Sequence, residues 1–115
     1  MQDVAKLNNV VVKLSKMDSV VNVYASSRAG VFALGAAPKM TDRAMISAIT
    51  SMMLGAAEQI GREMGDELNH VTLHLNDSCM VILGVGNKHL IGMVLDRSAD
   101  PDKVAKEAIS IIAQA

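Results

Sequence analysis

The sequence predicts an α+β protein in which antiparallel strands lie between helices. Two observations carry this prediction. Apolar residues recur at helical spacing in three segments, and short β-branched runs separated by tight turns lie between those segments. Strands joined by tight turns must be antiparallel, which excludes a doubly wound nucleotide-binding sheet. The predicted order is helix-strand-strand-helix-strand-strand-strand-helix.

The N-terminal third contains a helix followed by a hairpin. The apolar residues of the helix recur at steps of three and four, as on one face of an amphipathic helix. They are Val4, Leu7, Val10, Val11, Leu14 and Met17. Residues 20–25 and 31–34 are short runs rich in β-branched residues and are predicted to be strands. Gly30, in the turn between them, is free to take a positive φ.

The second helix is predicted from its caps as well as from its apolar residues. Thr41 or Asp42 can accept hydrogen bonds from the first free N–H groups of the helix. The helix is expected to continue to about Met64, and Gly65 is expected to end it in a left-handed conformation.

Three strands and a final helix complete the predicted fold. The strands cover residues 70–75, 79–85 and 89–95, and polar turns separate them. Asp100 is a favourable N-cap, and Pro101 is a favourable first helical residue.

The last three strands differ in polarity, which predicts their places in the sheet. Residues 80–83 and 90–95 are apolar on both faces, as expected when helices cover both sides of a sheet in three α/β/α layers. The strand before them places His70, Thr72 and His74 on one polar face. A half-polar strand favours a sheet edge, where unpaired backbone groups are available to another chain.

Composition and charge indicate a single domain over residues 1–115. The net charge of −1 gives no long-range attraction to nucleic acid or to an anionic membrane. No apolar run reaches the ~20 residues of a membrane span, so we expect no membrane insertion. The chain has one cysteine, Cys79, and does not begin with a signal-peptide pattern. We therefore expect a cytoplasmic protein.

The residue patterns of catalytic, metal and cofactor sites are missing. The glycines Gly84 and Gly86 precede a strand rather than a helix N-terminus that could hold phosphate. On a strand, His70 and His74 are ~13 Å apart, too far to share one metal ion. Cys79 shows no sign of an activating base. We expect no enzymatic activity, no metal and no cofactor.

The second helix carries two sets of residues that predict contacts. One apolar face, expected to lie on the sheet, consists of Met45, Ile49, Met53, Ala56 and Ile60. Beside it runs a ridge of mostly small residues, which is Ala44, Ala48, Ser51, Met52 and Gly55. Small side chains let a second helix approach closely, although the same residues would also fit tightly against the chain's own strands. Leu54 is expected to be exposed, roughly opposite the sheet.

These elements resemble a known family. The hairpin over residues 23–31 (VYASSRAGV), the second helix ending in Glu63-Met64-Gly65, and the run from Val71 to Leu95 are similar to those of Roadblock-type domains. The resemblance covers nearly the whole chain. One departure is Arg28-Ala29-Gly30, where an acidic residue often precedes the glycine in that family.

The resemblance implies a fold, an assembly and a function. The fold is the profilin-like Roadblock fold, a five-stranded antiparallel sheet with the second helix on one face and the terminal helices on the other. The assembly is a homodimer in which second helices and edge strands pair. Some members of the family regulate small Ras-like GTPases, and others are light chains of the dynein motor.

The sequence therefore predicts a non-catalytic homodimer that binds and regulates a small Ras-like GTPase. Its dimer interface is expected to contain Ala44, Ala48, Ser51, Met52, Gly55, His70, Thr72 and His74. The partner-binding residues are expected to be Arg43, Ser47, Leu54, Glu58 and Arg62. A structural light chain or scaffold subunit without a GTPase partner is the alternative, and an enzyme or ligand sensor on a related fold is a third.

Overall fold

The computed structural model describes residues 2–115 and contains the predicted elements in the predicted order. The elements are α1 (Gln2–Ser15), β1 (Val20–Ser27), β2 (Phe32–Gly35), α2 (Arg43–Glu63), β3 (Val71–His74), β4 (Cys79–Val85), β5 (His89–Leu95) and α3 (Pro101–Gln114). The bounds of β4 and β5 match the prediction. The structure extends β1 to Ser27 and limits β3 to four residues.

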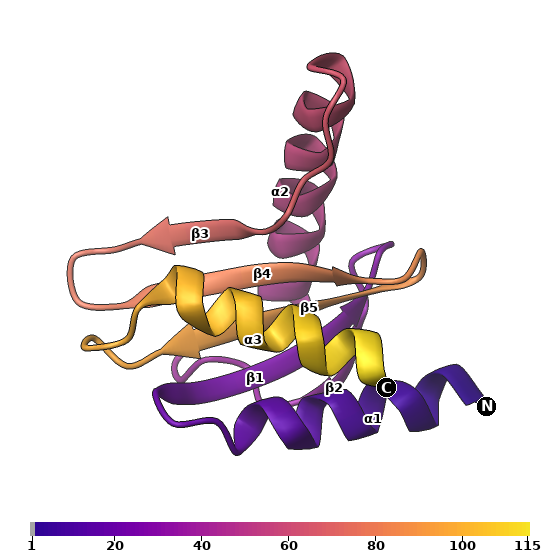
Figure 1. Ribbon diagram of the computed structural model, residues 1–115. Coiled ribbons are helices and arrows are strands. Elements are labelled where there is room, and N and C mark those ends of the chain that lie inside the picture. Colours follow the sequence, from indigo (N-terminus) through magenta and orange to yellow (C-terminus); the bar gives the residue numbers. More distant parts are fainter. Residues whose placement is uncertain (1) are drawn as a thin grey trace.

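All strands belong to one antiparallel sheet of five strands in the order β2-β1-β5-β4-β3. Figure 1 shows α1 and α3 side by side on one face, while α2 crosses the other. The C-terminal half of α2 extends past the β3 edge in this view. The three-layer arrangement is confirmed, and so is the edge position of β3.

Strand alternation divides the core into two clusters. On β4, Val81 and Leu83 face α1 and α3, whereas Met80 and Ile82 face α2. Both sets are buried because helices cover both faces of the strand. The prediction that β4 and β5 are apolar on both sides for this reason is confirmed.

The ends of the helices follow from local capping. The Asp42 carboxylate accepts hydrogen bonds from the N–H groups of Ala44 and Met45, so Asp42 rather than Thr41 caps α2. Asp100 caps α3 in the same way. Gly65 has a φ of +68°, the left-handed conformation predicted for the residue that ends α2.

Tyr24 fixes the distance between α2 and the sheet. Its ring is fully buried and lies over Gly92 on the neighbouring strand β5. Its hydroxyl donates a hydrogen bond of 3.1 Å to Thr50 Oγ1 on α2. Burial raises the pKa of the Tyr24 hydroxyl, so this group remains a neutral donor. The Tyr24 ring therefore lies between the sheet and α2, and its hydroxyl oxygen makes the polar contact with the helix.

Candidate protein-interaction surface

The face of α2 that packs on the sheet centres on Ser47, Thr50 and Leu54. These side chains are 0, 1 and 2 % exposed. The expectation that Leu54 is exposed is wrong, because Leu54 packs in the cluster around Tyr24 and Ile82. Ser47, also expected on a partner surface, is buried beneath the helix.

The predicted sheet face of α2 is mostly turned to solvent. Met45, Ile49 and Ile60 are 62, 44 and 62 % exposed, Ala56 is exposed, and Met53 alone is half-buried. The physical reason lies in the sheet. Because the Tyr24 hydroxyl needs a partner, a threonine faces it, and Thr50 in turn donates to the carbonyl of Ile46. Ser47 and Thr50 therefore lie on the sheet side together with Leu54, and the prediction is corrected.

The outward side of α2 carries a continuous apolar stripe. It consists of Met45, Ile49, Met52, Ala56 and Ile60. Met52, at 73 % exposure, is the most exposed of the large residues in this stripe. At 100° per residue these five positions lie opposite Ser47 and Leu54. An apolar patch of this kind on one side of a helix is typical of a protein-interaction site.

The predicted ridge of small residues divides between two environments. Ala44 and Gly55 are exposed on the flank of α2, and no atom lies within 4 Å of a Cβ built on Gly55. Ala48 is exposed but lies against Gly30 in the β1–β2 turn, and Ser51 donates a hydrogen bond to the Arg28 carbonyl. For Ala48 and Ser51, close packing against the chain's own strands is thus the better interpretation.

The five predicted partner-binding residues do not form one surface. Besides the buried Ser47 and Leu54, Arg43 lies over the Phe32 ring with 5.0 Å between its guanidinium carbon and the ring centroid. Arg62 donates to Gln59 near the other end of α2. At 1.5 Å per residue, Arg43 and Arg62 are roughly 28 Å apart along the helix.

Glu58, the fifth residue of that set, pairs with Arg28 within the chain. Arg28 Nη1 lies 2.6 Å from Glu58 Oε1, and both side chains are about two-thirds or more covered. The Arg28 carbonyl also accepts the hydrogen bond from Ser51. One residue of the β1–β2 turn therefore contacts α2 through both its side chain and its backbone.

Arg28 also holds the turn between β4 and β5. Its Nε donates to the carbonyl of His89 at 3.0 Å, and its Nη2 donates to the carbonyl of Gly86 at 3.0 Å. Its backbone N–H donates to the carbonyl of Lys88 at 2.7 Å. The guanidinium lies directly over Gly84, where a Cβ would collide with it. Sequence reasoning missed this network, although an arginine ending a strand and a glycine in an otherwise bulky strand were its visible signals.

We expect Arg28→Ala to lower the free energy of unfolding by about 2–3 kcal/mol, since it removes bonds to two carbonyls and to one carboxylate. Urea unfolding followed by circular dichroism measures this loss. Glu58→Gln keeps an acceptor and should cost less than about 1 kcal/mol. Arg97→Ala, on an exposed loop, is the matched control. Equal midpoints for Arg28→Ala and Arg97→Ala would contradict a role for this network.

The β3 edge carries the other predicted interface residues. His74 is exposed there, as expected. Thr72 is half-buried, and its hydroxyl has no hydrogen-bond partner among residues 2–115. His70 precedes the strand and turns toward α3, with its Nε2 3.5 Å from Asp102 Oδ1. His74 and Thr72 therefore remain candidates for the edge contact, whereas the His70 ring is directed toward the chain's own helix.

The described residues offer little for catalysis. Burial raises the pKa of the Cys79 thiol, which opposes formation of a nucleophilic thiolate. Over residues 2–115 no group of three or more His, Cys, Asp or Glu side chains is placed to hold a metal ion. None of the helices in that range has the length and apolar character needed to cross a membrane.

The arrangement of helices on a five-stranded sheet is shared with several solved structures. A Roadblock/LC7 domain from Streptomyces avermitilis matches with a TM-score of 0.76 and 13 % identity, over 91 % of this chain and 90 % of that chain. Myxococcus xanthus MglB matches with 0.79 and 15 %, over 95 % and 89 %. Profilin from Schizosaccharomyces pombe matches with 0.60 and 12 %, over 96 % and 93 %.

No protein-family model matches the chain, and neither does any curated protein sequence. At such low identity, the matched structures define a fold rather than an activity. The chain has the Roadblock/LC7 fold, which confirms the resemblance seen in its sequence at the level of architecture.

Proposed function

We propose that this protein is a non-catalytic homodimeric platform that binds a small Ras-like GTPase. The observation that carries the proposal is the apolar stripe on α2. It lies on the side of the helix that the chain's own sheet does not cover, and three of its side chains are more than 60 % exposed. A stable monomer gains nothing from such a stripe, whereas a second copy would bury it.

The sheet edge supports the same assembly. β3 has a neighbour on one side only, and the C-terminal half of α2 extends beyond it (Figure 1). A second copy that pairs with β3 would therefore place its sheet beneath this part of α2. In such an arrangement a single two-fold axis would relate the two copies. Each β3 edge would pair with the other β3 edge, and each apolar stripe with the other stripe.

The GTPase partner is inferred from the Roadblock fold together with the resemblance in sequence. Two copies of α2 paired side by side would present a surface that neither copy has alone. A globular partner placed over the two-fold axis would block its own second copy, so we expect one GTPase per dimer. Arg43 and Arg62, near the two ends of α2, would set the orientation of the partner more than its affinity.

We expect a small Ras-like GTPase from the same cell to bind the wild type in one of its two nucleotide states. Titration calorimetry with the GTPase loaded with GDP or with a non-hydrolysable GTP analogue measures binding and stoichiometry. Met52→Asp, designed to separate the two copies, should lose at least tenfold in affinity. Val4→Asp changes another exposed apolar residue, on α1, and should bind normally. Failure of every candidate GTPase to bind the wild type would favour the light-chain or scaffold function.

A further inference from the structure

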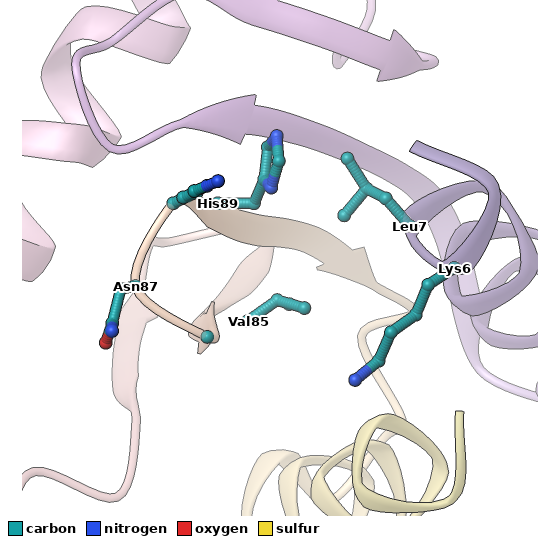
Figure 2. A pocket seen from close by; sticks show the side chains of 7 residues that line it. Lys6, Leu7, Val85, Asn87 and His89 are labelled. Atoms are coloured by element: carbon teal, nitrogen blue, oxygen red, sulfur yellow. The ribbon is translucent and has the colours of Figure 1, made fainter. Parts of the chain in front are cut away.

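A cavity of about 230 Å³ lies at the end of the sheet where α1 passes the β4–β5 turn. Figure 2 shows it from close by, with Lys6 and Leu7 reaching it from α1 and the remaining side chains coming from the turn and the adjoining strand ends. The lining residues are Lys6, Leu7, Val85, Gly86, Asn87, Lys88 and His89. The cavity is on the face of the sheet that carries α1 and α3, remote from the apolar stripe.

The lining of this cavity contains basic residues and no acidic ones. Lys6, Lys88 and His89 are basic, and none of the lining residues carries a carboxylate. Among the side chains of residues 4–115, the Lys6 amine and the His89 ring have no hydrogen-bond or ion-pair partner. A cleft lined by groups of one charge raises the local concentration of ions of the opposite charge. The cavity is therefore suited to an anion.

The donors approach from different directions. The amine of Lys6 enters from the α1 side in Figure 2, and the His89 ring comes from the start of β5, whereas the Asn87 amide points away from Lys6. An amine and an imidazole N–H can each donate to a separate oxygen atom. Leu7 and Val85 close the inner wall with apolar surface. Two donors that reach one cavity from different elements suit an anion with several acceptor oxygens, such as phosphate.

The turn that leads into His89 is held in place before any ligand arrives. The three hydrogen bonds from Arg28 to the carbonyls of Gly86, Lys88 and His89 fix the turn from its other side. Gly86 has a φ of +62°, which a glycine adopts at little cost. Because the backbone is fixed, little further ordering of the turn is needed when an anion binds.

We propose that this cavity binds a phosphate group, with Lys6 and His89 as its principal contacts. Its volume is below the ~300–1,000 Å³ of sites for drug-sized ligands, so it accommodates a small group rather than an extended molecule. The phosphate is either a free ion or the terminal group of a larger compound. The site is independent of the proposed dimer and of the GTPase surface, and it can be tested without either.

The test is a nuclear magnetic resonance titration of the full chain with inorganic phosphate, at ionic strength held constant with sodium chloride. The amides of residues 86–89 and of Lys6 should shift along saturable curves. Lys6→Gln should weaken binding at least fivefold, and Lys6→Arg should restore it. Lys13→Gln removes the same charge from an exposed position two turns away on α1 and should leave the curve unchanged.

A parallel titration with O-phosphoserine separates the two sources of phosphate. Tighter binding of O-phosphoserine assigns the site to phosphate carried on a larger compound, and tighter binding of inorganic phosphate assigns it to the free ion. Shifts that do not saturate, or equal weakening by Lys6→Gln and Lys13→Gln, would overturn the proposal, because either result means attraction by general surface charge.

Discussion

Gly92→Ala should destabilise the protein by about 3 kcal/mol or more, because overpacking a core that cannot relax costs this much. A Cβ on Gly92 would lie 2.5 Å from Tyr24 Cε1 and Cζ and 2.7 Å from its hydroxyl oxygen. The ring cannot withdraw without losing its burial and its hydrogen bond to Thr50. Urea unfolding at a fixed protein concentration measures the change.

A double-mutant cycle makes this prediction specific to the ring. In a Tyr24→Ala background the added methyl has room, so Gly92→Ala should cost much less there than in the wild type. Gly55→Ala is the control for the glycine-to-alanine change. A Cβ at Gly55 contacts nothing within 4 Å, and alanine should stabilise the middle of a helix by about 1 kcal/mol. An equal cost of Gly92→Ala in both backgrounds would mean that the collision with Tyr24 is not the cause.

Met52→Asp should convert a dimer into a folded monomer. The dissociation constant of the dimer should rise at least 100-fold. The substitution places a carboxylate in the middle of the apolar stripe, and two-fold symmetry makes each change occur twice. Light scattering should report about twice the 12.2 kDa chain mass for the wild type and the chain mass for the variant. Val4→Asp on α1 should remain dimeric. A Met52→Asp protein that is as dimeric as Val4→Asp would place the interface elsewhere.

Leu54→Asp provides the contrast two residues further along the same helix. Leu54 is 2 % exposed and packs between the helix and the sheet, so an aspartate there buries an unpaired charge. We expect Leu54→Asp to lose its native circular dichroism spectrum, whereas Met52→Asp should retain it. The pair therefore separates loss of assembly from loss of folding, which a single substitution on α2 would not do.

The elements of this fold were predictable because local signals determine them. Asp42 and Asp100 cap their helices through backbone N–H groups within three residues, and Gly65 ends α2 by its own conformation. The alternation on β3 favoured an edge strand, and β3 does lie at the edge of the sheet. In each case the decisive partner lies close in sequence.

The orientation of α2 was not predictable because its decisive partner lies far away. Hydrophobicity marks both a face that packs on a sheet and a face that packs on a second chain, and it does not distinguish them. Thr50 is turned inward by the hydroxyl of Tyr24, 26 positions earlier. The ion pair between Arg28 and Glu58 spans 30 positions and was invisible for the same reason.

The hydrogen bonds from Arg28 to the β4–β5 turn affect where the chain tolerates inserted residues. A peptide tag inserted between Gly86 and Lys88 would move the carbonyls that Arg28 holds and would thereby disturb α2 through Glu58. The turn between β3 and β4 is held only locally: Asn76 and Asp77 are exposed, and the Leu75 N–H donates to the carbonyl of Ser78. Fluorescent labels and epitope insertions belong at Asn76–Asp77, where an exposed loop tip tolerates added residues.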